Sequence, residues 1–174
     1  QRICEGRFEF EVFTTHAENS SSLQQLGIES VKFSYSLIDR FLVNMGSNPL
    51  WQKIQNRIKI IGGFEKKMAE HKCDLVYFSA PSGYAASFKK LNYITTVWDN
   101  CHRDTPEFPE VRDFNQFFIR EKMYRDCLAK SVVVMVDSEC SADSISFRYG
   151  VDRERLLSMP FSPSPSLNTD KARS

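Results

Sequence analysis

Short apolar runs, separated by stretches with apolar residues at helical spacing, set the pattern of this chain. The clearest runs are Asp74–Ala80, Tyr93–Trp98 and Ser131–Val136, which are rich in β-branched and aromatic residues. Continuous runs of this kind are typical of strands buried in a parallel sheet. Phe8–Thr14 and Ile28–Tyr35 alternate apolar and polar residues instead, which predicts strands with one covered face.

Helical patterns fill most of the intervals between these runs. From Ser36 to about His71 apolar residues recur at helical spacing, with interruptions at Gly46–Pro49 and Gly62–Gly63. Further helices are predicted at Tyr84–Leu91 and Val111–Lys130. In the second of these, the residues expected to face the core are Phe114, Phe117, Phe118, Met123 and Leu128.

The two ends of the chain add a loop, a helix and a last strand. The polar, serine-rich stretch His16–Ser22 is predicted to be a loop. Ser138 or Ser141 is a natural N-cap for a helix that ends near Gly150. A short strand is predicted at Leu156–Met159.

This order of elements, β-β-α-β-α-β-α-β-α-β, indicates a Rossmann-like α/β fold: a mostly parallel sheet with helices on both faces. Residues 1–160 are expected to form the domain, and the proline- and serine-rich residues 161–174 a linker or tail. A doubly wound domain normally begins with a central strand and a glycine-rich turn. Because the chain opens on QRICEG, we expect that first strand to be missing.

Composition excludes several classes of protein. Values of 41% hydrophobic and 26% charged residues are ordinary for a globular domain, which excludes fibrous and disordered chains. A net charge of +1 gives no electrostatic case for nucleic acid. No apolar run reaches the roughly 20 residues that a membrane span requires. Because Gln1–Phe10 lacks a continuous apolar stretch, we expect no signal peptide.

Cysteine and histidine usage argues for a reduced, metal-free protein. The five cysteines include no C-x-x-C pair and the chain has only three histidines, so we expect thiols of a cytoplasmic protein with no metal and no cofactor. Residues 53–72 are basic and amphipathic. This segment either contacts an anionic membrane surface or is the solvated outer face of the fold.

The polar loop after the strand Tyr93–Trp98 contains the main candidate site. Ligands of open α/β sheets bind where strands end, and here Asp99, His102 and Arg103 follow a buried strand directly. A second turn, Ser82–Gly83, follows the strand before it, and its small residues would let a ligand approach the backbone. The alternative is that these residues only cap helices and pair with one another at the surface.

Three blocks of the region from about Asp74 to Pro163 resemble the amino-terminal domain of family-four retaining glycosyltransferases of the GT-B fold. The first is TVWDNCHRDTPEFPEV (Thr96–Val111), with the strand, acid, histidine and Pro-Glu-Phe of that family. The second is VDSECSADSISFRYGVDRERL (Val136–Leu156), with a Ser-Glu pair and a helix that ends in Tyr-Gly-Val-Asp. The third is the run LLSMPFSPSP, where the chain would cross to a second domain.

The resemblance implies catalytic roles for Asp99 and His102, as contacts to the transferred sugar or to an acceptor hydroxyl. Arg103 would steer an anionic group, and Glu107 lies in the same loop. Trp98 stands where many relatives have a histidine, and its ring could stack on a sugar or fill the core. Ser138 and Glu139 would orient the following helix and the wall of the cleft.

The resemblance also implies partners. Such enzymes bind an acceptor, here a glycan or a lipid-linked molecule, mainly in this domain, and a nucleotide-sugar donor mainly in a second Rossmann-like domain in cis. These residues alone are therefore not expected to transfer sugar. Two other hypotheses remain open: a nucleotide-sugar epimerase of the same architecture, and a non-catalytic module that binds carbohydrate or protein.

Overall fold

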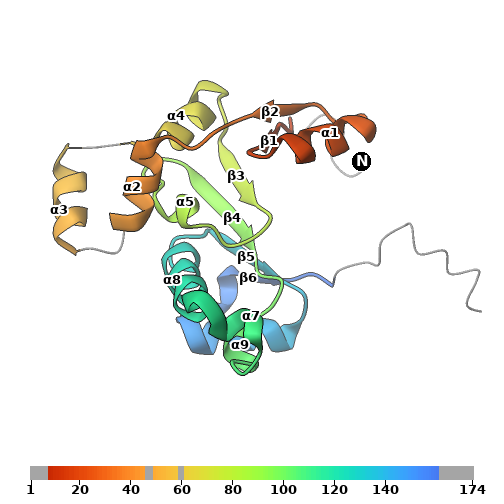
Figure 1. Cartoon of the computed structure of the whole chain (residues 1–174), viewed down its shortest axis with the longest axis vertical. Coiled ribbons are helices and arrows are strands. Elements are labelled where there is room, and N and C mark those ends of the chain that lie inside the picture. Colours follow the sequence, from red (N-terminus) through yellow and green to blue (C-terminus); the bar gives the residue numbers. More distant parts are fainter. Residues whose placement is uncertain (1–7, 46–48, 59–60, 161–174) are drawn as a thin grey trace, which may run out of the picture.

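The computed structural model describes residues 8–45, 49–58 and 61–160, and its centre is a sheet of four parallel strands (Figure 1). The strands are adjacent in chain order: β3 (Leu75–Phe78), β4 (Asn92–Thr96), β5 (Val133–Val136) and β6 (Leu156–Ser158). A separate parallel pair is formed by β1 (Val12–Thr14) and β2 (Ser30–Lys32). The α/β class and the parallel pairing are confirmed, although the strands fall into two sheets.

The helices lie mainly between the strands. In chain order they are α1 (Ala17–Gln25), α2 (Leu37–Met45), α3 (Pro49–Ile58), α4 (Gly63–Glu70), α5 (Gly83–Ala86), α6 (Cys101–Asp104), α7 (Pro109–Arg112), α8 (Gln116–Leu128) and α9 (Glu139–Tyr149), with 3₁₀ turns at Asp113–Asn115 and Arg153–Arg155. None of the described helices meets the length and hydropathy needed to span a bilayer. The linker expected at 161–174 lies outside the described residues.

The stretch predicted to be a serine-rich loop begins the helix α1, so that prediction was wrong. Parallel strands cannot be joined by a tight turn, and α1 forms the crossover between β1 and β2. The Ser21 and Ser22 hydroxyls donate to the carbonyls of Ala17 and Glu18, one helical turn back. The serines are thus accommodated in a helix that the topology requires.

The break predicted at Gly62–Gly63 is confirmed, and a buried carboxylate explains it. Asp39 of α2 accepts hydrogen bonds from the Ser36 amide (2.8 Å) and hydroxyl (2.6 Å) and from the Phe64 amide (3.0 Å). A Cβ on Gly62 would lie 2.6 Å from Asp39 Oδ1. Glycine is therefore required where α4 begins beside α2.

A second buried carboxylate ends α5 earlier than predicted. Glu65 accepts hydrogen bonds from the backbone amides of Lys89, Lys90 and Leu91. These amides turn toward α4 and cannot continue a helix, so the structure has α5 at Gly83–Ala86 where the pattern predicted Tyr84–Leu91.

The core lies between the four-stranded sheet and the helices that follow its strands. Val134 and Val136 of β5 are fully buried against Leu128 of α8 and Ile145 of α9. Tyr93 of β4 faces the same side, and its hydroxyl donates to the Cys127 carbonyl. A second cluster of buried residues packs on the same side of β3 and β4; it includes Phe64, Met68, Ala85, Phe88 and Cys127.

Two predictions about α8 have different outcomes. Leu128 is buried as predicted, but Phe118 is 69% exposed and does not face the core. The predicted continuous helix is instead divided into α7, the 3₁₀ turn Asp113–Asn115 and α8, which interrupts the helical spacing on which that prediction depended. The side chain of Phe114 lies outside the described residues.

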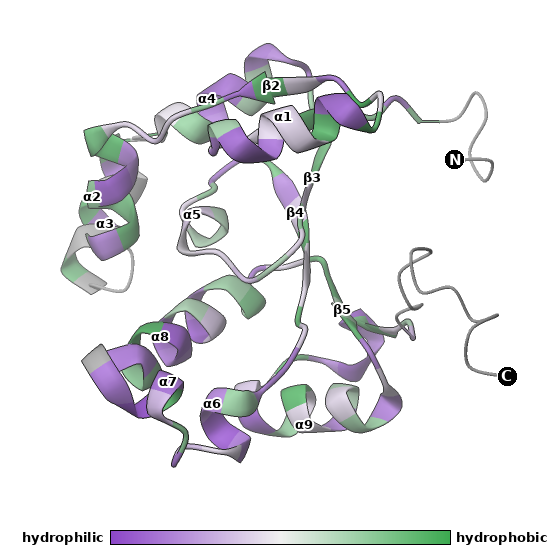
Figure 2. Ribbon diagram, turned by 45° about the vertical axis from the view of Figure 1, so that its right-hand side comes forward, coloured by the Kyte–Doolittle hydropathy of each residue, from purple (hydrophilic) through white to green (hydrophobic). Residues whose placement is uncertain are grey.

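The opposite face of the sheet differs from our expectation that helices would cover both faces. Register pairs Tyr77 with Ile94 and Ile94 with Val133, so these side chains share one face. Leu75, Tyr77 and Leu157 are exposed on that face. Figure 2 shows α5 and α8 together on one side of β3 and β4. The connections that contain α5, α8 and α9 join strands that are neighbours in chain order and run in the same direction. Right-handed crossovers of this kind place their helices on one face of the sheet.

Candidate functional site

The loops that leave β3, β4 and β5 meet at one edge of the sheet, because parallel strands all end on the same side. They contain Ser79–Gly83, Val97–Asn100 and Asp137–Glu139. The Trp98 indole Nε1 donates to the Ser79 carbonyl at 2.5 Å and ties the first two loops together. The strand-end location predicted for the candidate loop is therefore present.

Trp98 and Asp99 are predicted site residues that are open to solvent at the end of β4. Trp98 is 52% exposed although its indole is anchored. Asp99 Oδ1 accepts from the Cys101 amide at 2.9 Å and lies 3.7 Å from Arg120 Nη1. The hydroxyl of Tyr124 donates to the Asp99 carbonyl. The loop is thus held on three sides while an aromatic ring and a carboxylate remain accessible.

His102 points in the opposite direction, into the protein. It is fully buried in α6, its ring is packed edge-on against Tyr124, and its Nε2 lies 3.0 Å from the Tyr149 hydroxyl. That hydroxyl donates to Glu121, so its oxygen accepts from His102 Nε2–H. Burial lowers the pKa of His102, which keeps the ring neutral near pH 7. A direct contact of His102 with a sugar stays a prediction that would require this packing to open.

Glu121 of α8 is the centre of the polar cluster behind the loop. Its carboxylate accepts both Nε and Nη2 of Arg103, Nε of Arg125 at 2.6 Å, and the Tyr149 hydroxyl at 3.1 Å. These donors, Arg103 first, lower the pKa of Glu121 to about 2. The ionised carboxylate of Glu121 is thus largely shielded from solvent. It connects its own helix, α8, to α6 through Arg103 and to α9 through Tyr149.

Arg103 is engaged in this cluster rather than directed at solvent. Its guanidinium forms a two-point contact with Glu121 and lies 5.0 Å from the centre of the Tyr149 ring. The paired carboxylate raises the pKa of Arg103. Steering of an anion by Arg103 stays a prediction that would require the pair to separate. Glu107 lies in the following turn and is exposed.

The remaining predicted residues hold helix ends. Ser138 is the N-cap of α9, as predicted, and its hydroxyl accepts from the Ser141 amide. Glu139 is exposed and pairs with Arg153. Ser82 is the N-cap of α5. Gly83 is needed for packing, because a Cβ there would lie 2.8 Å from Val43 Cγ1.

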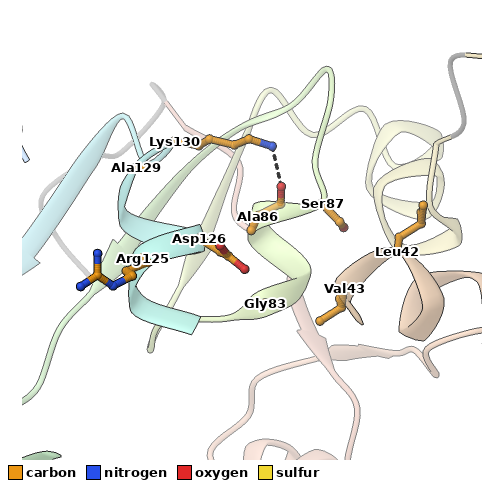
Figure 3. Close-up of a pocket in the computed structure, with 9 residues that line it drawn as sticks. All are labelled: Leu42, Val43, Gly83, Ala86, Ser87, Arg125, Asp126, Ala129 and Lys130. Carbon is orange, nitrogen blue, oxygen red and sulfur yellow. Dashed lines mark hydrogen bonds between the residues drawn. The ribbon is translucent and has the colours of Figure 1, made fainter. Parts of the chain in front are cut away.

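A small cavity of about 170 Å³ lies between α2, α5 and α8 (Figure 3). Neither Trp98 nor Asp99 is among the residues that line it. Its lining includes Gly83, Leu42 and Val43, and the Lys130 ammonium closes one side by donating to the Ala86 carbonyl at 2.6 Å. Ligand pockets usually measure about 300 Å³ or more. This cavity is therefore too small for a nucleotide sugar.

The sequence did not indicate Glu121, Tyr124 or Tyr149 as part of the site. Each lies on a helix distant in sequence from the loop, and only Tyr149 falls in a block of the family resemblance. Within 8–45, 49–58 and 61–160, no group of three or more His, Cys, Asp or Glu side chains is placed to hold a metal ion. Comparison with protein-family models and with curated proteins produced no match for this chain.

Proposed function

We propose that this chain is the acceptor-side domain of a retaining glycosyltransferase. Trp98 stacks on a sugar ring, and Asp99 accepts a hydrogen bond from a sugar hydroxyl. The nucleotide-sugar donor is bound by a second Rossmann-like domain in cis, so transfer takes place in the cleft between the two.

The observation on which the proposal depends is the half-exposed Trp98 beside Asp99 at the carboxyl edge of β4. An aromatic ring fixed by its own N–H offers a flat apolar surface at little cost in side-chain entropy. The adjacent carboxylate supplies the acceptor that a sugar hydroxyl needs. The three blocks that resemble family-four glycosyltransferases support the same assignment.

The buried cluster around Glu121 supports the proposal because it holds the loop with Trp98 and Asp99 in place. Tyr124 holds the Asp99 carbonyl, while His102 and Arg103 attach α6 to Glu121 and Tyr149. A loop fixed in this way presents Trp98 and Asp99 in one geometry, as a binding site requires. In this arrangement Asp99 contacts the substrate, and His102 and Arg103 act as positioning residues.

Binding of simple sugars tests the proposal. Isothermal titration of the chain with methyl α-glucopyranoside and methyl α-mannopyranoside should show weak binding to at least one of them. Trp98→Ala and Asp99→Asn should each weaken that binding by roughly tenfold, the size expected for losing one aromatic contact or one charge-assisted hydrogen bond. Phe147→Ala, which removes an exposed aromatic ring on α9, should leave it unchanged.

Other outcomes would favour the alternatives. Tight binding of UDP-glucose or GDP-mannose to these residues would contradict an acceptor-side role and favour the epimerase. Sugar binding that is insensitive to Trp98→Ala, or absent altogether, would remove the proposed site.

A further inference from the structure

The helices α2 and α3 present apolar side chains to solvent. Figures 1 and 2 show α3 beside α2, on the side away from the four-stranded sheet. On α3, Leu50, Ile54 and Ile58 are 71%, 46% and 63% exposed and recur every four residues, so they form one stripe. On α2, Leu37, Ile38 and Phe41 are also exposed. We call these six side chains the α2–α3 face.

The charges around this face have one sign. Lys53 and Arg57 of α3 and Arg40 of α2 are exposed. Asp39 is the one acid in the sequence of these two helices, and it is buried, where it binds Ser36 and Phe64. On the described residues of α2 and α3, exposed large apolar side chains are therefore accompanied by cations and by no exposed acid.

We propose that the α2–α3 face binds an anionic lipid bilayer, with the α3 stripe in the interface and Lys53 and Arg57 against the headgroups. Helices with Leu, Ile or Phe on one side and Lys or Arg beside them bind membrane interfaces in this way. A second copy of the chain fits less well, because pairing two such faces would bring like charges together. The inference does not depend on the transferase proposal.

Only part of the basic segment that the sequence indicated, residues 53–72, belongs to the proposed membrane-binding face. Residues 53–72 comprise the end of α3 and the whole of α4. Phe64 and Met68 of α4 are buried in the core, so α4 has no apolar stripe to insert. Lys66 of α4 and Lys72 of the turn after it are exposed, and they serve as matched cations outside the proposed face.

Co-sedimentation with vesicles tests the proposal. The chain should bind vesicles of phosphatidylglycerol and phosphatidylcholine and should not bind vesicles of phosphatidylcholine alone. Lys53→Gln with Arg57→Gln should weaken binding about 30-fold, since each cation at an anionic surface contributes about fivefold. Lys66→Gln with Lys72→Gln, which removes the same amount of charge from α4 and the turn after it, should have a much smaller effect.

A second set of variants tests the contribution of the apolar side chains to vesicle binding. Leu50→Gln with Ile54→Gln and Ile58→Gln should abolish binding while the circular dichroism spectrum stays that of the wild type. Leu26→Gln with Phe118→Gln and Phe147→Gln removes three exposed apolar side chains elsewhere and should leave binding intact. Equal binding to neutral vesicles, or no loss in the α3 variants, would overturn the proposal. So would a dimer, detected by light scattering, that the α3 substitutions dissociate.

Discussion

At the scale of single residues, the charge of Glu121 should contribute to the stability of the fold. Its pKa of about 2, against an ordinary value of 4.5, means that the ionised form stabilises the fold. Glu121→Gln should lower the free energy of unfolding at pH 7 by about 1–3 kcal/mol, because the paired Arg103 loses a charged acceptor at low exposure. Urea denaturation at pH 7 measures this difference.

The effect of Glu121→Gln on stability should also depend on pH. A depressed carboxyl pKa contributes stability above the unfolded value near 4.5 and loses it as the pH falls toward 2. The difference between wild type and Glu121→Gln should therefore shrink markedly between pH 7 and pH 3. A difference that stays constant over that range would show that shape, not charge, is responsible. Glu110→Gln, at an exposed position of α7, should show no difference at either pH.

At the scale of elements, the joint between α2 and α4 depends on the pair Gly62 and Asp39. Gly62→Ala would place its Cβ 2.6 Å from Asp39 Oδ1 and displace the carboxylate from the Phe64 amide. We expect a loss of about 1–3 kcal/mol in the free energy of unfolding. In an Asp39→Ala background the same substitution has room, so most of that loss should disappear. Additive losses in the double variant would contradict this account.

Elements were predictable where the signal is local. The strands β3, β4 and β5 follow from their apolar runs, and the N-cap at Ser138 follows from residue type. The predictions failed where a residue or strand distant in sequence determines whether a helix forms or where it ends. The early end of α5 is set by Glu65, about 24 residues away, and α1 is imposed by the parallel pairing of β1 with β2.

The candidate site also has some features that the sequence could predict and others that it could not. Its position at the end of β4, with Trp98 and Asp99 open to solvent, could be derived from a buried strand followed by polar residues. The burial of His102 could not, because it depends on Tyr149, which is 47 residues further along the chain. Sequence spacing places a side chain on a loop, but tertiary packing decides which way it points.

At the scale of the whole molecule, the four-stranded sheet has one face packed with helices and one face on which Leu75, Tyr77 and Leu157 are exposed. Parallel sheets normally have both faces covered, and an exposed apolar surface of this kind binds hydrophobic dyes. Leu75→Thr with Leu157→Thr should therefore reduce the fluorescence of 8-anilinonaphthalene-1-sulfonate bound to the folded chain. Threonine suits a strand, so the unfolding transition should stay cooperative and change by about 0.5 kcal/mol or less.

A matched variant decides whether this effect belongs to the sheet face. Leu26→Thr with Phe147→Thr also removes two large exposed apolar side chains, but from the C-cap of α1 and from α9, outside the strands of the sheet. Dye binding depends on adjacent apolar side chains, which the register places next to one another across β3, β4, β5 and β6. The control should thus keep the wild-type fluorescence. Equal reductions in both variants would mean that the dye reports total exposed apolar area, and that the open face of the sheet has no special affinity.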